Sequence, residues 1–272
     1  MSGMRTVLKA FLAGLPRRWR ETLCEAVAEG LHDDALRGLL ARLAQTRAED
    51  LQAGEALRFL FRLDDRLYKV QGEQAVRFGA GLHPKHRLMA YHDFFVGRLE
   101  PGERVLDVGC GNGALTRDMA ERGGCRVLGI ELESVKVEEA RRLRPHPHVE
   151  YRVGDATSEE GLNGPFDVVT LSNVLEHLSE RPEFLKRLVV RCGARRLLIR
   201  VPLFERDWRV ALKRELGVAW RLDATHQTEY TLESFHEEMR AAGLVVVHLE
   251  VRWGEIWSET RPVDAGPAEV VA

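Results

Sequence analysis

The sequence predicts a Rossmann-like, doubly wound α/β domain behind an N-terminal helical extension, and two patterns carry this prediction. From residue 101 onward, short apolar runs of strand length alternate with amphipathic stretches of helical length. Strands of a parallel sheet are buried on both faces, so their sequences are apolar throughout, and helices cover the sheet. Up to about residue 99, apolar residues instead recur at three- and four-residue steps, which predicts amphipathic helices.

The composition is that of an ordinary folded chain and excludes several other classes. The 272 residues are 44% hydrophobic and 30% charged, so disordered and fibrous classes are excluded. The 40 basic and 42 acidic residues give a net charge of -2 and form no basic arm for nucleic acid. The four cysteines lack the spacing of a zinc site or a disulfide framework, which predicts a reducing, cytoplasmic location. No apolar window is long enough to span a membrane, and the N-terminus lacks the apolar stretch of a signal peptide.

Seven apolar runs are the expected strands of the sheet. They are Arg104–Val108, Arg126–Ile130, Val149–Val153, Asp167–Leu171, Arg196–Val201, Leu244–Val251 and Glu255–Glu259. Helices are expected between them at Ala114–Arg122, Val135–Leu143, Glu183–Val190, and from Thr231 to Gly243. Residues 203–230 break this alternation with aromatic and polar residues, so we expect an insertion there.

The first 82 residues are expected to form a helical extension that acts as a lid or as a homo-oligomer contact, with the main domain at residues 83–272. Helix starts are predicted near Pro16 and Asp33, and a glycine-containing break at Gln71–Gly81. A further helix is predicted to start at Pro84. Its apolar face is expected to carry Leu88, Tyr91, Phe95 and Leu99.

The strongest motif is a glycine-rich loop after the first strand. Gly109, Gly111 and Gly113 alternate there, immediately before a helix. The missing side chains let a ligand approach the backbone and the helix N-terminus, which is typical of nucleotide cofactors. A dinucleotide fingerprint is the rival interpretation, since Gly109, Gly111 and Ala114 also fit its spacing. Asp107 separates the two, because a buried carboxylate beside a pyrophosphate would add repulsion.

Acidic residues at the ends of three successive strands together describe one ligand. Asp107 favours a ligand with a cationic amino-acid end. Glu131, 18 positions after Gly113, is placed to accept both hydroxyls of a ribose. Asp155 follows the third strand and is placed to accept from an adenine amine. We therefore expect an amino acid joined to a nucleoside, without phosphate.

With these residues the sequence resembles the class I S-adenosylmethionine-dependent methyltransferases, from about residue 101 to the C-terminus. The matching segments are the loop from Asp107 to Gly113, Glu131, Gly154–Ala156, and Phe166–Val169 leading into Ser172–Leu178. The resemblance implies S-adenosylmethionine as cofactor and S-adenosylhomocysteine as product. It also implies a seven-stranded sheet whose last strand runs antiparallel.

The resemblance also implies roles for the cofactor-binding residues. The glycine loop would hold the methionine moiety, Glu131 the ribose, and Asp155 with Ala156 the adenine. Leu132 and Asn173 complete the implied cofactor-binding set. Upstream, the resemblance implies that Arg87 or Tyr91 contacts the methionine carboxylate. The histidines clustered at residues 83–92 are interpreted as surface or lid residues rather than metal ligands.

Ser172–Leu178 follows the fourth strand, at the sheet edge where open α/β sheets bind ligands. A sulfonium methyl group is already electrophilic, so the protein must align the reactants and remove a proton from a weak nucleophile. His177 is the candidate general base for a hydroxyl, because the ordinary pKa of histidine lies near 6.5. Glu176 and His226 are candidates to assist it. The alternative is that Glu176 and His177 only cap or orient the following helix.

Two other functions stay open. The Glu-His pair also resembles the small-RNA 2'-O-methyltransferases, where a Glu-x-x-Glu-His motif and a later histidine bind a divalent metal. Glu176, His177 and His226 would match, but Asn173 takes the first glutamate position and weakens such a site. A metal is therefore not expected, although these residues leave room for one, and the absence of a basic surface disfavours RNA. The third function is a non-catalytic binding module that retains the cofactor fold.

The acceptor pocket is expected at the insertion. Trp208 and Trp220, with hydrogen-bonding neighbours, suit a ring-shaped polar acceptor, because rings stack and hydroxyls need partners. Packing under a long loop is the alternative role of both tryptophans. We therefore expect O-methylation of a small molecule or glycan, with neither nucleic acid nor a membrane as partner.

Overall fold

The computed structural model describes residues 7, 10, 11, 13–80, 83–158 and 164–263. The chain forms two compact units, residues 1–66 and 67–272. Helix α4 (Ala53–Phe78) contributes to both units. The main-domain boundary expected at residue 83 lies further along the chain than this division and stays a prediction.

The first unit is helical, as its apolar spacing predicts. α2 (Arg17–Glu29) begins directly after Pro16, and α3 (Asp33–Glu49) begins at Asp33. Acidic residues in the first turn of α3 face the positive end of the helix dipole and stabilise that start. Both predicted helix starts are confirmed. Phe61 of α4 is buried, while α2 and α3 bury no described side chain.

The predicted break at Gln71–Gly81 is wrong in its first part, because α4 continues through Gly72 to Phe78. One glycine costs a helix only about 1 kcal/mol. Helix formation is cooperative, and the good helix formers on both sides of Gly72 offset that cost.

The single helix predicted from Pro84 is also wrong, since two short helices are present there. α5 (Lys85–Met89) and α6 (Tyr91–Val96) are separated by Ala90, whose φ of 50° lies in the left-handed region. This kink changes the direction of the chain and leaves Leu88 58% exposed. The other members of the predicted apolar face are buried, namely Tyr91, Phe95 and Leu99.

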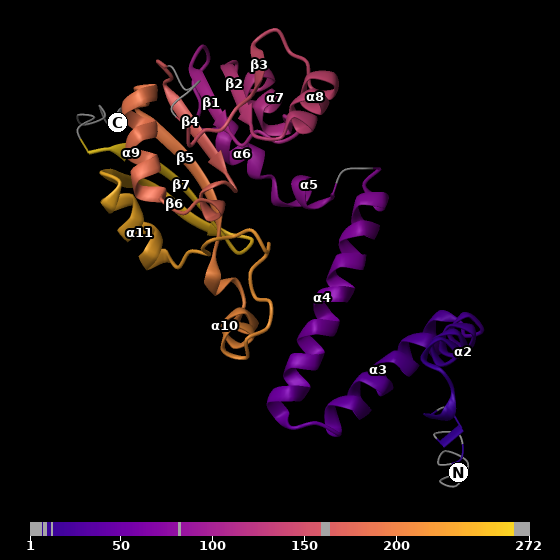
Figure 1. Ribbon diagram of the computed structural model, residues 1–272. Coiled ribbons are helices and arrows are strands. Elements are labelled where there is room, and N and C mark those ends of the chain that lie inside the picture. Colours follow the sequence, from indigo (N-terminus) through magenta and orange to yellow (C-terminus); the bar gives the residue numbers. More distant parts are fainter. Residues whose placement is uncertain (1–6, 8–9, 12, 81–82, 159–163, 264–272) are drawn as a thin grey trace. The chain divides into compact units, whose positions relative to one another are not determined.

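The second unit is built around one seven-stranded sheet of order β3-β2-β1-β4-β5-β7-β6 (Figure 1). The strands are β1 (Arg104–Val108), β2 (Arg126–Glu131), β3 (Val149–Val153), β4 (Val168–Ser172), β5 (Arg196–Pro202), β6 (Leu244–Arg252) and β7 (Glu255–Pro262). β1 to β5 are parallel, and β7 is antiparallel to both of its neighbours, β5 and β6. The predicted doubly wound sheet with an antiparallel last strand is confirmed.

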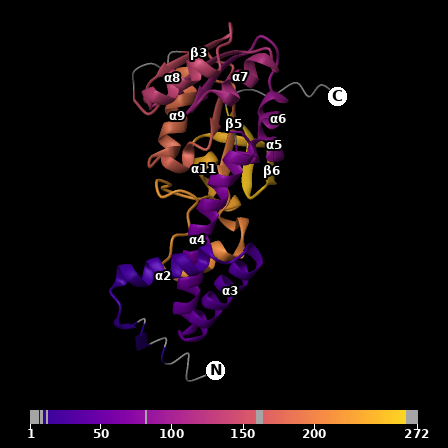
Figure 2. The ribbon, with the colours of Figure 1, turned by 90° about the vertical axis from the view of Figure 1, so that its right-hand side faces the viewer.

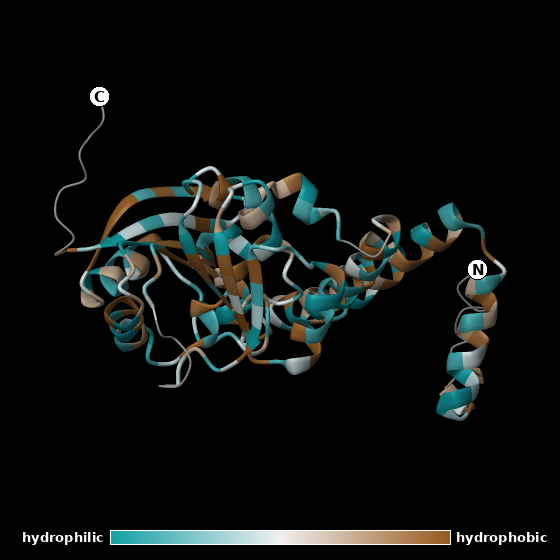
Figure 3. Ribbon diagram, turned by 90° about the horizontal axis from the view of Figure 1, so that it is seen from above, coloured by the Kyte–Doolittle hydropathy of each residue, from teal (hydrophilic) through white to brown (hydrophobic). Residues whose placement is uncertain are grey.

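Helices cover both faces of this sheet, as Figures 1 and 2 show. α9 (Arg181–Cys192) and α11 (Leu232–Ala241) pack on one face, within the largest apolar cluster. α6 and α7 (Ala114–Glu121) pack on the other face, and α8 (Ser134–Leu143) packs beside β2 and β3. The neighbours Val105 and Leu106 on β1 belong to different clusters, because successive side chains of a strand point to opposite faces. In Figure 3, hydrophobic residues, coloured brown, recur along the strands.

The insertion expected at residues 203–230 lies between β5 and α11. It contains η2 (Phe204–Arg206), α10 (Trp208–Glu215) and a long loop. Its two ends meet, since Leu203 and Tyr230 pair as an isolated β-bridge. The insertion thus begins and ends at the carboxyl end of β5, near the sheet edge at which open α/β sheets bind ligands. Within the described residues, the helices are too short or too polar to cross a bilayer.

Candidate functional site

The glycine loop after β1 has the geometry of a ligand cradle. Gly109, Gly111 and Gly113 all have positive φ, at 69°, 54° and 76°. A Cβ at Gly109 would lie 2.7 Å from Val174 Cγ2, and one at Gly113 would lie 2.5 Å from the Tyr151 hydroxyl. A Cβ at Gly111 would meet nothing within 4 Å. The outer glycines are therefore required by packing, and Gly111 faces open space where a ligand can approach.

Asp107 is buried directly beneath this loop. One carboxylate oxygen accepts a hydrogen bond from Thr116 Oγ1 (2.6 Å), and the other accepts one from Thr170 Oγ1 (2.7 Å). Burial raises the pKa of Asp107 to about 6, although the two threonine hydroxyls oppose that shift. The carboxylate thus joins β1, α7 and β4. The sequence analysis missed both threonines, and the strand register that pairs Asp107 with Thr170 is the signal that points to one of them.

Glu131 and Asp155 lie at the same sheet edge as the loop. Glu131 ends β2, and its Oε2 accepts a hydrogen bond from the Gly111 N–H (2.9 Å). Asp155 follows β3 and is exposed, and its Oδ1 accepts from the backbone N–H and hydroxyl of Thr157. The Gly154 N–H donates to the Glu131 carbonyl and ties these two strand ends together. Three carboxylates therefore lie at or just beyond the carboxyl ends of adjacent strands, as expected, while their assigned roles stay predictions.

Leu132 and Ala156, which also belong to the predicted cofactor-binding set, differ in their exposure to solvent. Leu132 is 68% exposed at the start of the loop before α8. Ala156 is half-buried and packs against the largest apolar cluster. Both lie at the edge of the candidate donor site, and neither role is tested by the geometry alone.

After β4 the chain turns sharply into η1 (Leu175–His177). Asn173 has a φ of 56°, and its side-chain amide donates to Glu176 Oε1 (2.8 Å). Glu176 is fully buried, and its Oε2 has no hydrogen-bond partner within the described part of the chain. Burial raises the pKa of Glu176 to about 7, against the opposing hydrogen bond from Asn173.

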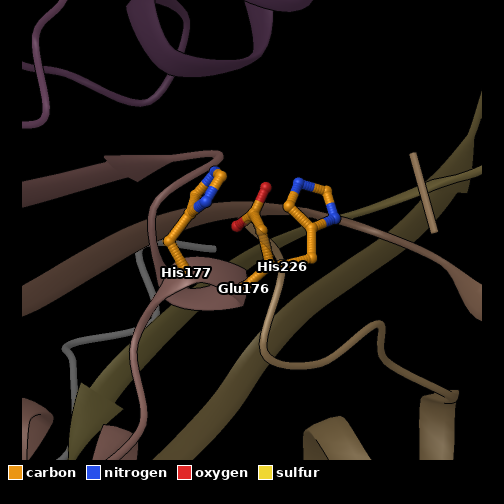
Figure 4. A group of neighbouring side chains, drawn as sticks. All are labelled: Glu176, His177 and His226. Atoms are coloured by element: carbon orange, nitrogen blue, oxygen red, sulfur yellow. The ribbon is translucent and has the colours of Figure 1, made fainter. Parts of the chain in front are cut away.

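His177 and His226 stand beside this carboxylate, as Figure 4 shows. Their ring centroids lie 4.7 Å apart, edge to face. His177 Nδ1 contacts Thr225 Oγ1 (2.9 Å), and His226 Nδ1 contacts Glu229 Oε1 (3.3 Å). Burial, followed by the nearby His226, lowers the pKa of His177. One ligand atom from each of Glu176, His177 and His226 lies within 4.8 Å of the other two. The structure thus brings together the three predicted catalytic residues.

Arg200 on β5 is a buried charge that the sequence analysis did not single out. Its guanidinium makes two hydrogen bonds to Glu255 (2.6 and 2.7 Å) and donates to Ser172 Oγ (3.1 Å). It also lies 3.9 Å from the centre of the Tyr91 ring. Tyr91, expected near the methionine carboxylate, therefore fastens α6 to the sheet by a cation–π contact. The signal available in the sequence was an arginine inside an otherwise apolar strand, which indicates a buried charge.

Two of the histidines before β1, His86 and His92, border a cavity of about 460 Å³. His86 Nδ1 contacts the Tyr91 hydroxyl (2.8 Å), and His92 Nδ1 contacts Asp118 (2.8 Å). Arg87 is exposed at the rim of this cavity. These histidines are tied to protein groups on separate helices, which fits the interpretation of residues 83–92 as a covering segment.

With this geometry established, comparison with known proteins identifies the family. A family described as a methyltransferase domain matches residues 81–249. A 2-methyl-6-phytyl-1,4-hydroquinone methyltransferase of Synechocystis is 33% identical over 159 residues, which cover 54% of this chain and 48% of that protein. A ribosomal protein L11 methyltransferase of Thermosipho africanus is 33% identical over 129 residues, with coverages of 43% and 48%.

A ubiquinone biosynthesis O-methyltransferase of Xanthomonas axonopodis is 44% identical over 94 residues, which cover 32% of this chain and 38% of that protein. The chain thus spans about half, or less, of the length of the curated relatives it matches. Among solved structures, magnesium protoporphyrin IX methyltransferase from Synechocystis with bound SAH gives a TM-score of 0.51 at 20% identity. That similarity covers 64% of this chain and 83% of the other, and it shows a shared fold.

The buried carboxyl of Asp107 predicts a pH dependence of stability. Its folded-state pKa of about 6 lies above the ordinary value of 3.8, so the contribution of the protonated form is complete below pH 4 and is lost as the pH rises through 6. A shift of roughly two units corresponds to about 3 kcal/mol. We expect Asp107→Asn to remove most of this dependence, measured as the free energy of unfolding in urea at pH 4 and pH 7.

Asp155→Asn is the matched control, because it removes an exposed carboxylate at the same sheet edge. The control should retain the dependence of the wild type. An Asp107→Asn protein whose stability changes with pH as the wild type does would contradict the assignment.

Proposed function

Because the chain belongs to the methyltransferase domain family, we propose that it transfers a methyl group from S-adenosylmethionine to a hydroxyl oxygen of a small molecule or glycan. The observation that carries the proposal is the meeting of two loops at one sheet edge. Val174, beside the histidine cluster, packs directly on Gly109 of the glycine loop. A donor on the glycine loop and a hydroxyl at His177 would therefore lie side by side.

The glycine-loop half of the site fits S-adenosylmethionine, which supplies an electrophilic methyl group when bound. Gly111 offers an open backbone surface, and Glu131 lies beside it to accept ribose hydroxyls. Asp155 and Ala156 would border the adenine. Asp107 would act through the loop that it braces, because both of its oxygens already accept bonds from threonines.

The histidine half of the site supports proton removal. The lowered pKa of His177 keeps its ring neutral at pH 7, so the ring is able to accept a proton from a hydroxyl. Glu176 and His226 border the same space. They would contact the acceptor or the protonated ring and help to hold both in line with the donor.

The acceptor class is inferred from the insertion and from relatives. Trp208 at the start of α10 is 72% exposed, which suits stacking on a ring. Trp220 packs edge to face on Phe204, with Arg221 4.5 Å from its ring centre, so it fits the alternative packing role. Relatives named for a hydroquinone and for O-methylation in ubiquinone biosynthesis support a small hydroxylated acceptor, whereas the L11 enzymes are named for a protein.

The domain assignment belongs to the same proposal. Residues 83–272 would form the catalytic domain, with the insertion at residues 203–230 on the acceptor side. The helices of residues 1–82 would serve as a lid or a homo-oligomer contact. The free cysteines fit a reducing compartment, so we infer a cytoplasmic location.

Loss of the Glu131 carboxylate should weaken donor binding. We expect Glu131→Ala to lose about 1 to 3 kcal/mol of affinity for S-adenosylhomocysteine, the usual cost of removing a desolvated polar partner. Calorimetric titration measures this. Glu138→Ala, at an exposed position on α8, is the control and should bind as the wild type does. Unchanged affinity in Glu131→Ala would overturn the ribose assignment.

Removal of the candidate base should stop chemistry without preventing donor binding. His177→Ala is expected to lower methyl transfer to hydroxylated acceptors by about 10²- to 10⁴-fold, the usual contribution of a general base. Transfer of labelled methyl from S-adenosylmethionine to a panel of phenols and glycosides is the measurement, with calorimetry to show retained cofactor affinity. His236→Ala, exposed on α11, is the matched histidine control. Undiminished transfer by His177→Ala would rule out this role.

One observation favours a second, metal-assisted mechanism. One carboxylate oxygen of Glu176 and one ring nitrogen from each histidine lie within 4.8 Å of one another, a donor set that suits a divalent transition metal with open coordination positions. Glu176 Oε2 also has no hydrogen-bond partner among the described residues. Such an ion would bind the acceptor hydroxyl and lower its pKa. His177 would then be a metal ligand, and the ion rather than the His177 ring would activate the hydroxyl.

Chelation separates the two mechanisms. Activity that survives dialysis against EDTA would eliminate the metal-assisted mechanism. Activity that is lost with EDTA and restored by a divalent cation would instead establish it, and would remove His177 from the role of base. Manganese and zinc are the ions to add back, since both accept imidazole and carboxylate ligands.

A further inference from the structure

The chain contains the tripeptide Asp-Ala-Thr twice, and both copies fold into the same turn. In each, one aspartate oxygen accepts from the threonine backbone N–H (2.8 Å) and from the threonine hydroxyl (2.7 Å), in Asp155–Thr157 and again in Asp223–Thr225. The second copy differs in one respect. Thr225 Oγ1 also lies 2.9 Å from Nδ1 of His177, 48 positions away in the sequence.

Counting hydrogens fixes the direction of this contact. A threonine hydroxyl has one hydrogen, and an ionised carboxylate only accepts hydrogen bonds. Thr225 must therefore donate its hydrogen to Asp223, which leaves the hydroxyl oxygen as an acceptor toward His177. Nδ1 of His177 must supply the hydrogen of that bond. The neutral ring is then the Nδ1–H tautomer, and Nε2 carries the lone pair.

The same reasoning applies to His226. Its Nδ1 lies 3.3 Å from Glu229 Oε1, and Glu229 is buried and paired with Arg206. The Leu222 N–H also donates to Glu229 Oε1. A carboxylate paired with an arginine accepts hydrogen bonds, so His226 also donates from Nδ1.

His177 therefore offers a lone pair at Nε2, and Glu176 Oε2 beside it has no hydrogen-bond partner within the described part of the chain. A ring nitrogen with a free lone pair fits a group that brings its own hydrogen, which a hydroxyl does. We propose that Thr225, anchored on Asp223, is the positioning residue that holds His177 with its Nε2 lone pair toward the acceptor hydroxyl. The inference rests on the proposed function only in naming that hydroxyl.

Nitrogen-15 NMR of the full chain, labelled at histidine and saturated with S-adenosylhomocysteine, tests the tautomer directly. His177→Asn identifies the His177 signals by their loss. In the wild type, Nδ1 should give the signal of a protonated ring nitrogen and Nε2 that of an unprotonated one. A His177 ring protonated at Nε2 would overturn the proposal.

Three variants test the role of the threonine. Thr225→Val removes the acceptor and should shift His177 toward the Nε2–H tautomer, while Thr225→Ser should retain the wild-type signals. Thr157→Val removes the hydroxyl of the matched turn, which contacts no histidine in any described hydrogen bond, and should leave the His177 signals unchanged. Retention of the Nδ1–H tautomer in Thr225→Val would refute the positioning role.

Kinetics distinguish this inference from the function on which it rests. Thr225→Val should lower kcat by roughly 10- to 100-fold, the usual effect of removing an orienting partner, with KM and cofactor affinity retained, and Thr225→Ser should restore the rate. A kcat unchanged by Thr225→Val despite a shifted tautomer would show that the proton is not taken by His177. That outcome overturns the proposed base and leaves the tautomer assignment standing.

Discussion

A buried carboxylate held by two threonine hydroxyls determines where the glycine loop lies. Asp107 belongs to β1, Thr170 lies opposite it on β4, and Thr116 belongs to the first turn of α7. One side chain therefore joins two strands and a helix at the start of the loop. Because the carboxylate is buried, removing either hydroxyl would leave one of its two oxygens without its threonine partner, at a cost of about 1 to 3 kcal/mol. The outward-facing backbone at Gly111 and the start of α7 both depend on this junction.

The contact between Gly109 and Val174 sets the second constraint, because it brings the loop after β4 against the loop after β1. Any side chain at Gly109 would separate them. The parallel register adds Glu131 at the same edge from β2, so the groups proposed to bind the donor and to accept the proton come from neighbouring strands. Methyl transfer needs little from a protein beyond alignment and proton removal. A rigid sheet edge would supply the alignment in the proposed reaction, and the insertion after β5 contributes His226 to the same cluster.

Patterns that depend on near neighbours were predictable, and contacts between distant segments were not. Alternating runs predicted the sheet, and the residues of β1 and β3 were predicted without error. The loop glycines all have positive φ, a local demand that their spacing indicates, while their role in cofactor binding stays a prediction. By contrast, the partners of Arg200 are distant in sequence, and Thr225 is 48 positions from His177. Helix α4 passed through Gly72 because cooperativity along the helix outweighs the preference of one residue.

The pKa shifts of Glu176 and His177 favour proton acceptance by His177. Burial raises the pKa of Glu176 to about 7 and lowers that of His177, so both shifts favour the uncharged forms. In the proposed reaction, a proton taken by His177 creates a positive charge within 4.8 Å of the Glu176 carboxyl. With a pKa of about 7, Glu176 is ionised in part of the molecules near pH 7, and in these its carboxylate stabilises the imidazolium. In those molecules the proposed proton transfer to His177 forms an ion pair with Glu176, which would stabilise the transition state more than the ground state.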